Sequence, residues 1–368
     1  MTVEVSSLYL HVPYCRHLCN YCDFFKKKLE NSDTQFTEFE NYLSESWTHH
    51  EAWMKQEGIS WSKKWDSVYL GGGTPSLWGE RGAHFLRNLL PVKSVEEWTL
   101  EVDPGTWSEG MFNSWMDVGV NRLSIGTQSL DEKFLKILDR AHSLDESYLL
   151  LNRAQDLGIN YSFDFLLGVP HSQPYKRNVI KELETFLQFN PHHVSLYILN
   201  ARSKYPLANF MPEDEYTASE YLEVCAFLEE KGLHQYEVSN FARTGFESIH
   251  NKKYWDSQNV AALGPTGTGF IKFSNEEAKR YKWKPGKPLF ETEVLGKEEI
   301  ELEKLYLELR TMRGWLPATH QRSQKLETKL EEWVQRGLVK SVAPRIVLNS
   351  KGLVILDSLM DELFSLGL

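Results

Sequence analysis

Three of the four cysteines lie within eight residues, at Cys15, Cys19 and Cys22 in the stretch HVPYCRHLCNYCDF. Thiolates are the ligands of iron–sulfur clusters and of structural zinc, whereas a lone cysteine such as Cys225 usually packs as a small apolar side chain. A cubane cluster normally takes four thiolates, one for each iron. This motif supplies three and the nearby sequence offers no fourth, so one iron would stay open to a ligand from outside the protein.

Zinc is the alternative at these cysteines, with His11 or His17 as the fourth ligand, because C-x2-C beside a histidine is common in zinc sites. A second motif, Gly71-Gly72-Gly73-Thr74-Pro75, directly follows a predicted strand. Three glycines let backbone N–H groups approach a ligand closely and adopt positive φ. Taken alone, a run of glycines is equally well explained by a tight turn.

Composition and charge exclude several classes of protein. The chain has 368 residues, 41% hydrophobic and 25% charged, which is typical of a globular protein with a sizeable core. The net charge is −10, and the run Lys26-Lys27-Lys28 is typical of a solvated face, so we expect no nucleic-acid binding. The sequence contains neither an apolar run of ~20 residues nor a secretory signal, and its cysteines form no disulfide framework. These features predict a cytoplasmic location.

Short apolar runs alternate with longer amphipathic stretches over more than 200 residues, which predicts a parallel sheet with crossover helices. The predicted strands are 8–12, 67–70, 97–102, 122–125, 161–167, 193–199 and 234–238. About six strand–helix units are too few for a closed eight-stranded barrel, so we predict an α/β fold with a partial, open (β/α)6 barrel. The glycine-rich and polar motifs all follow strands, at the end that carries the active site in barrels.

After about Gly296 the pattern becomes helix, helix, short hairpin, helix, which resembles a small winged-helix module. Its second helix interleaves lysines and glutamates and offers no basic face, so a packing lid or a partner surface is the better interpretation. We therefore predict a barrel over residues 1–240, a post-barrel segment over 241–296 and an α+β module over 297–368.

The cysteine spacing, followed one strand later by GGGTP, resembles the radical S-adenosylmethionine (SAM) superfamily. In that superfamily the open iron chelates the amino and carboxylate groups of SAM, and an electron from the cluster cleaves SAM. Further stretches resemble the HemN/HemW group, which contains oxygen-independent coproporphyrinogen III dehydrogenase and its haem-chaperone paralogues. They are YLHVPYC, YLGGGTPSLW, EVDPGT, NRLSIGTQS, LDRAHS, FDFLLGVP, HVSLY, YEVSNFAR and HNKKYW, between Tyr9 and Trp255.

The resemblance implies that Cys15, Cys19 and Cys22 ligate a [4Fe–4S] cluster and that nine residues bind SAM. These are Tyr9, Tyr21 near the adenine, Gly72, Gly73 and Thr74 at the methionine part, Glu101, Gln128, Arg140 facing the carboxylate, and Asp164. The residue types suit SAM, because a zwitterionic amino acid needs a carboxylate and a guanidinium, and a ribose diol needs an acceptor. Taken singly, Arg140 is equally a helix-end charge, Asp164 a cap and Gln128 a turn residue.

Two features favour the haem chaperone over the dehydrogenase. Phe24 stands where the dehydrogenase has a fourth cysteine, and with Cys15 so early we expect the longer N-terminal segment of that enzyme to be missing. His250, in HNKKYW, matches an H-N-x-x-Y-W motif associated with haem binding, and histidine is a common axial haem ligand. The plain alternative for His250 is a surface histidine in a loop after the last barrel strand.

The resemblance therefore implies a chaperone that holds a cluster and SAM, binds haem and passes it to haem-dependent acceptor proteins. It would need an electron donor and would meet the membrane periphery through its acceptors. The alternative function is radical decarboxylation of coproporphyrinogen III. The stretch Leu263–Gly269 departs from the glycine- and alanine-rich pattern of the family and has Pro265 in the turn. This departure is the sole support for a third interpretation, in which the fold is kept and the function is lost.

Overall fold

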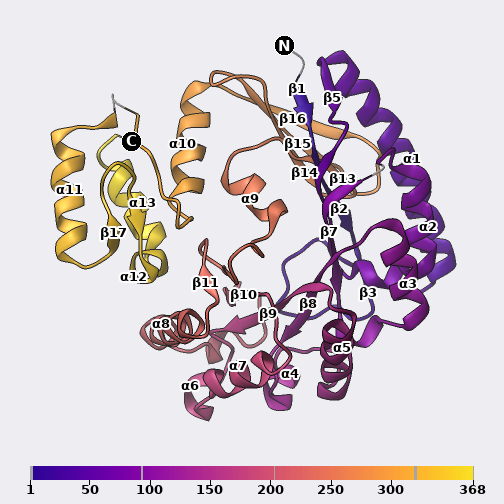
Figure 1. Cartoon of the computed structure of the whole chain (residues 1–368), viewed down its shortest axis with the longest axis horizontal. Helices are drawn as coiled ribbons and strands as arrows, with labels where there is room; N and C mark the ends of the chain where they lie inside the picture. Colours follow the sequence, from indigo (N-terminus) through magenta and orange to yellow (C-terminus); the bar gives the residue numbers. More distant parts are fainter. Residues whose placement is uncertain (1–2, 93, 203, 319–320, 368) are drawn as a thin grey trace.

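A nine-stranded sheet forms the body of the molecule in the computed structural model, which describes residues 3–92, 94–202, 204–318 and 321–367. Its strand order is β11-β12-β10-β9-β8-β7-β6-β2-β13. The six inner strands run parallel in chain order: β2 (Ser7–Val12), β6 (Trp65–Gly72), β7 (Val95–Val102), β8 (Arg122–Gln128), β9 (Asn160–Leu167) and β10 (His193–Ile198). The two edges, β11 and β13, do not pair within the described residues, which confirms the open, partial barrel (Figure 1).

Helices cover the outside of this sheet because alternate strand residues there are apolar. Val68 and Leu70 of β6 are fully buried, and Phe163 of β9 stacks on Phe186 with ring centroids 3.9 Å apart. The helices between the strands are α1 (Ser32–Gln56), α2 (Gly79–Leu89), α3 (Glu109–Val118), α4 (Glu132–Ile137), α5 (Leu144–Leu157), α6 (Ser172–Tyr175), α7 (Val179–Leu187) and α8 (Asp214–Glu230). Side-chain caps fix several starts, including a capping box between Ser143 and Glu146 at α5.

Short elements complete the connections. They are β1 (Val3–Val5) with β5 (Ile59–Trp61), β3 (Tyr14–Cys15) with β4 (Lys27–Lys28), and the 3-10 turns η1 (Pro75–Trp78), η2 (Pro104–Thr106) and η3 (Ala208–Phe210). The pairing of β3 with β4 matters most, because it closes the loop that carries the three cysteines.

Two expectations about local structure, one of them an alternative interpretation, were wrong. The predicted strand 234–238 is shortened to β11 (His234–Gln235), and the chain then turns back as β12 (Asn240–Ala242), antiparallel to β10. The motif HNKKYW forms the helix α9 (Ile249–Trp255) and not a loop.

The segment 241–296 contains strands that the sequence did not reveal. β13 (Ala261–Leu263) pairs in parallel with β2, so the barrel sheet continues past residue 240. β14 (Thr268–Lys272), β15 (Ala278–Trp283) and β16 (Phe290–Leu295) form an antiparallel sheet that packs on α1, where the Tyr281 hydroxyl meets His50 Nε2 at 2.7 Å. The division at residue 240 remains a prediction about how the chain is organised.

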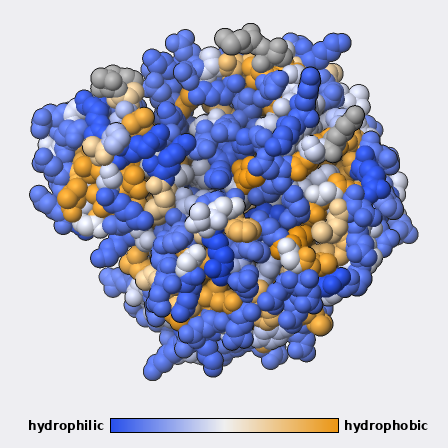
Figure 2. All heavy atoms as spheres, in the orientation of Figure 1, coloured by the Kyte–Doolittle hydropathy of each residue, from blue (hydrophilic) through white to orange (hydrophobic). Residues whose placement is uncertain are grey.

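The C-terminal part has its own core, built around Leu305, Trp315, Leu330, Trp333 and Leu359. Its elements follow the predicted order: α10 (Lys297–Glu308), α11 (Gln324–Gln335), the hairpin β17 (Val339–Ser341) and β18 (Val347–Leu348), α12 (Ser350–Val354) and α13 (Leu356–Phe364). Figure 1 shows this module at the left, with α9 between it and the sheet. Figure 2 shows the same face as mainly hydrophilic, with apolar residues in separate groups. In the described part of the chain, no helix has both the length and the apolar character needed to cross a membrane.

Substituting Phe163 should test whether the stacked pair between β9 and α7 stabilises the barrel. Phe163→Ala should lower the free energy of unfolding by about 3–5 kcal/mol, because it removes a fully buried ring and leaves a cavity. Leu149→Ala, on the exposed side of α5, should change it by less than about 0.5 kcal/mol. Urea unfolding followed by circular dichroism measures both, and equal effects would contradict this account of the core.

Candidate functional site

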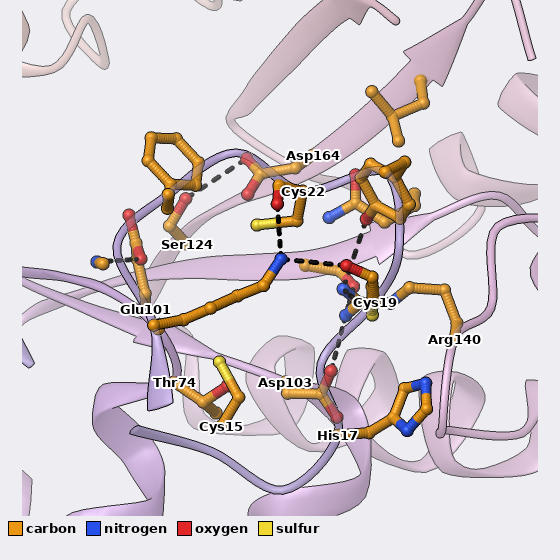
Figure 3. Close-up of a pocket in the computed structure, with 18 of the residues that line it drawn as sticks. Cys15, His17, Cys19, Cys22, Thr74, Glu101, Asp103, Ser124, Arg140 and Asp164 are labelled. Atoms are coloured by element: carbon orange, nitrogen blue, oxygen red, sulfur yellow. Dashed lines mark hydrogen bonds and ion pairs between the residues drawn. The ribbon is translucent and has the colours of Figure 1, made fainter. Parts of the chain in front are cut away.

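A cavity of about 380 Å³ opens at the carboxyl ends of the parallel strands. Eleven predicted site residues line it: Cys15, Cys19, Tyr21, Cys22, Gly72, Gly73, Thr74, Glu101, Gln128, Arg140 and Asp164. Figure 3 shows the three cysteines around one space, with Glu101 and Thr74 toward one side and Arg140 and His17 toward the other. Tyr9 and His250 are not among the described lining residues. The lining also contains Lys26, Tyr69, Asp103 and Tyr197, which the sequence analysis did not select.

Hydrogen bonds from the backbone and from one lysine hold the cysteine loop in place. Leu29 N donates to Cys15 O at 2.9 Å, and Lys26 Nζ donates to the carbonyls of Cys19 and Cys22 at 2.8 and 2.5 Å. Burial raises the pKa of the Cys15 thiol to about 11, partly opposed by a hydrogen bond with Thr74, and burial also raises that of Cys19. The thiols would therefore release protons when they bind a metal.

Both histidines that could complete a zinc site have other partners. His11 donates from Nε2 to Phe25 O at 2.8 Å, and its Nδ1 lies 3.1 Å from the Tyr9 hydroxyl. His17 Nε2 pairs with Asp139 at 2.9 Å. Over the described residues, no three His, Cys, Asp or Glu side chains are arranged to hold one metal ion. In a cubane cluster the three thiolates would bind separate irons.

The glycines after β6 permit close packing against the cysteine loop. Gly72 has φ of +116°, and a Cβ on it would lie 2.5 Å from the His11 ring, while a Cβ on Gly73 would lie 2.7 Å from Tyr14 O. Their N–H groups are already used, that of Gly72 by Glu101 Oε2 at 2.9 Å and that of Gly73 by Val12 O at 2.8 Å. The expectation that these N–H groups are free to meet a ligand is therefore not met in this conformation.

Two partly buried carboxylates give the cavity its electrostatic character. Glu101 accepts hydrogen bonds from the Tyr69 hydroxyl and from Gly72 N, and Asp164 accepts one from the Ser124 hydroxyl at 3.2 Å. Burial, reinforced by the charge of Asp164, raises the pKa of Glu101 to about 7. Burial raises the pKa of Asp164 to about 6, against hydrogen bonds from Ser195 and Ser124. Within the described ranges neither carboxylate forms an ion pair, so the cavity suits a ligand with positive charge. SAM has an ammonium and a sulfonium.

Arg140 lies beside the cysteine loop, but its guanidinium already has a carboxylate partner. Nη2 pairs with Asp103 Oδ2 at 2.5 Å and donates to Gly126 O at 2.8 Å. Nη1 lies 3.4 Å from the Tyr21 hydroxyl and 4.0 Å from Cys19 Sγ. Arg140 is thus placed to fix the loop, and a SAM carboxylate would have to share the guanidinium with Asp103.

The aromatic residues Tyr9 and His250 lie beneath the cavity. The His250 imidazole stacks on the Tyr69 ring with centroids 5.2 Å apart, and Ser67 Oγ lies 2.8 Å from its Nδ1. Only 1% of His250 is exposed, burial lowers its pKa to about 3, and Nε2 is buried without a hydrogen-bond partner. The interpretation of His250 as a surface-loop residue is therefore wrong.

The start of α9 is fixed inside the barrel by one carboxylate. Glu97 of β7 accepts hydrogen bonds from the Ser248 hydroxyl and from the backbone N–H groups of Ile249 and His250, each at 3.0 Å. Lys253 of the same helix pairs with Asp66 at 2.5 Å. A carboxylate at a helix N-terminus is favourable in both charge and hydrogen bonding, so α9 is firmly docked.

The altered turn after β13 packs on the barrel strand. Gly264 has φ of +87°, and a Cβ there would lie 2.3 Å from His11 O. None of the residues 263–269 is among the described residues that line the cavity. The departure from the family pattern in Leu263–Gly269 therefore lies outside this cavity.

The raised pKa of Glu101 generates a prediction for SAM binding. A cationic ligand needs the ionised carboxylate, so affinity should rise by roughly eightfold from pH 6 to pH 7.5 as a group with pKa about 7 loses its proton. Glu101→Gln should bind more weakly and lose most of this dependence. Equilibrium dialysis of labelled SAM against the anaerobically reconstituted protein measures the affinity at each pH. Glu96→Gln, at an exposed position on the same strand, is the control variant. The same pH profile in Glu101→Gln would contradict the assignment.

The sequence model of the radical SAM superfamily matches residues 9–183. The heme chaperone HemW of Bacillus subtilis is 30% identical over 331 residues, which cover 84% of each chain. HemW of Lactococcus lactis is 27% identical over 98% of each chain. The mitochondrial radical S-adenosyl methionine domain-containing protein 1 of Bos taurus is 33% identical over 96% of this chain and 82% of its own length.

Among solved structures, the coproporphyrinogen III oxidase HemN of Escherichia coli superposes with a TM-score of 0.78, covering 98% of this chain and 90% of that chain. The sequence identity is 17%, so this similarity shows the fold. The matched relatives extend over both the barrel and the C-terminal module. From the cysteine loop, the cavity and these relatives together, the chain belongs to the HemW-like family of the radical SAM superfamily.

Proposed function

We propose that this chain is a haem chaperone of the HemW kind. It would hold a [4Fe–4S] cluster and SAM in the cavity, bind haem and pass it to haem-dependent proteins. The observation that carries the proposal is one cavity shared by three cysteines and two partly buried carboxylates, which form no ion pair with a described residue. The chain also has HemW relatives over nearly its full length.

In this proposal Cys15, Cys19 and Cys22 ligate the cluster, and Glu101 and Asp164 bind the positively charged and hydroxyl groups of SAM. When bound, cluster and SAM supply one-electron reductive cleavage, as in the superfamily. The residues of this chain hold the loop, exclude water and supply the ionised carboxylates. Tyr21, buried against Arg140, packs the loop where the adenine is expected.

Cluster ligation is tested at the middle cysteine of the loop. Cys19→Ser should abolish the brown chromophore and reduce bound iron to well below one cluster per chain after anaerobic reconstitution, because a hydroxyl is a poor substitute for a thiolate. Cys225→Ser is the matched control, since Cys225 is buried on α8, away from the cavity lining. Iron and sulfide analysis and absorption spectra measure the cluster content of both variants. A full cluster signal in Cys19→Ser would refute the ligand set.

Haem binding through His250 requires a change of conformation. Its Nε2 lacks a partner, which leaves an imidazole nitrogen for a metal, but the ring is enclosed by Tyr69, Tyr9 and Tyr254. We propose that α9 swings out of the barrel when haem binds. Release of the Glu97 and Asp66 contacts would accompany this motion.

The proposed axial ligand is tested with a second histidine as reference. His250→Ala should weaken haem binding at least tenfold and change the Soret band, because it removes the ligand nitrogen. His234→Ala, at an exposed site paired with Glu229, should leave both unchanged. Spectrophotometric haem titration measures the two variants. Equal affinities and spectra for His250→Ala and the unmodified protein would mean that another residue is the axial ligand.

Decarboxylation of coproporphyrinogen III has less support. Phe24, which stands at the position resembling the fourth cysteine of the dehydrogenase, is 69% exposed beside the cavity and supplies no thiolate. We also propose an electron donor, haem-acceptor proteins and a cytoplasmic location, since an oxygen-labile cluster needs reducing surroundings. The C-terminal module, with its mixed charges, is a suitable surface for an acceptor.

A further inference from the structure

We propose that Lys26 is a fixed positive charge that makes the cluster easier to reduce. The inference rests on the proposed cluster at Cys15, Cys19 and Cys22, and it adds a residue that is not itself a ligand. Lys26 is a positioning residue with two tasks. Its N–H groups hold the loop carbonyls in place, and its charge lies where an added electron would be placed.

The position of Lys26 differs from that of the two lysines that follow it. Lys27 and Lys28 form β4 and are exposed, as expected for a solvated face. Lys26 is only partly exposed, lines the cavity, and donates from Nζ to the carbonyls of Cys19 and Cys22. The interpretation of all three lysines as a solvated face is therefore wrong for Lys26.

The charge of Lys26 is not cancelled nearby. Arg140, a second cation near the cysteines, is paired with Asp103, and Arg16, which also lines the cavity, donates to Gly105 O at 2.9 Å. The partners of Lys26 are backbone carbonyls, which are uncharged, and in the described ranges of the chain it forms no ion pair. The hydrogen bonds from Nζ to the carbonyls of Cys19 and Cys22, at 2.8 and 2.5 Å, place this charge beside the cysteine loop.

The sign of the effect follows from electrostatics. Net charge and hydrogen bonding around an iron–sulfur cluster set its reduction potential. One-electron reduction by an external donor adds one negative charge and makes or breaks no bond. A fixed positive charge in a partly buried site favours that added charge more strongly than one in water does. Removing the charge of Lys26 should therefore make reduction harder.

Three variants separate charge from hydrogen bonding. Lys26→Met removes both, Lys26→Gln keeps an N–H donor without the charge, and Lys26→Arg keeps both. Lys27→Met makes the same change of charge on the exposed strand, where solvent screens it. Each full-length protein is reconstituted anaerobically without SAM and analysed for iron and sulfide. The cluster is then titrated with dithionite and redox mediators, and the reduced form is followed by electron paramagnetic resonance.

The reduced-to-oxidised ratio at a fixed potential should fall on the order of tenfold in Lys26→Met and Lys26→Gln, a midpoint about 59 mV more negative. Lys26→Arg and Lys27→Met should stay near the unmodified protein. Unchanged midpoints in cluster-loaded Lys26→Gln would overturn the inference. If Lys26→Arg assembles a cluster and both uncharged variants do not, the charge acts in cluster assembly, and the inference about reduction is overturned. Assembly failure in all three Lys26 variants would overturn the charge role. Failure of the unmodified protein to assemble any cluster would instead refute the proposed function.

Discussion

The arrangement of the site depends on two partly buried acidic side chains that line the cavity. Glu101 and Asp164 lie in the cavity without an ion-pair partner among the described residues, and their pKa values are raised to about 7 and 6. The thiols of Cys15 and Cys19 are also held protonated by burial. Unpaired charge in a low-dielectric site is costly, so such groups either stay neutral or receive a positive partner. In the proposed function, a metal cluster and a cationic cofactor would supply that partner and complete the site.

The same strands connect this cavity to the helix that carries the haem motif. The Tyr69 hydroxyl donates to Glu101 in the cavity, while the Tyr69 ring stacks on His250 below it. Glu97 lies four residues before Glu101 on β7. It accepts hydrogen bonds from the first backbone N–H groups of α9. The cavity and the proposed haem site thus share β6 and β7. The segment of α9 also contacts the C-terminal module, where Arg313 pairs with Asp256 at 2.8 Å. A movement of α9 would therefore change contacts both with β6 and β7 and with the C-terminal module.

Local patterns predicted the parts of the site that depend on local chemistry. The cysteine spacing and the glycines after β6 could be predicted from residue type and strand period, whereas Glu101 and Asp164 were selected through the family resemblance. Contacts between segments far apart in the sequence could not be predicted. The ion pair of Arg140 with Asp103 and the burial of His250 under Tyr69 depend on contacts between distant segments. The strands β13 to β16 were missed because short strands in a polar segment give little periodic signal.

Anaerobic incubation of the reconstituted protein with SAM, a reductant and coproporphyrinogen III, with haem titrated into a parallel sample, tests the central claim most directly. The account predicts stoichiometric haem binding and transfer to an apo-haem protein, with no protoporphyrinogen formed. Conversion of coproporphyrinogen III to protoporphyrinogen would contradict it, and would mean that a chain with Phe24 in place of a fourth cysteine still performs the decarboxylation.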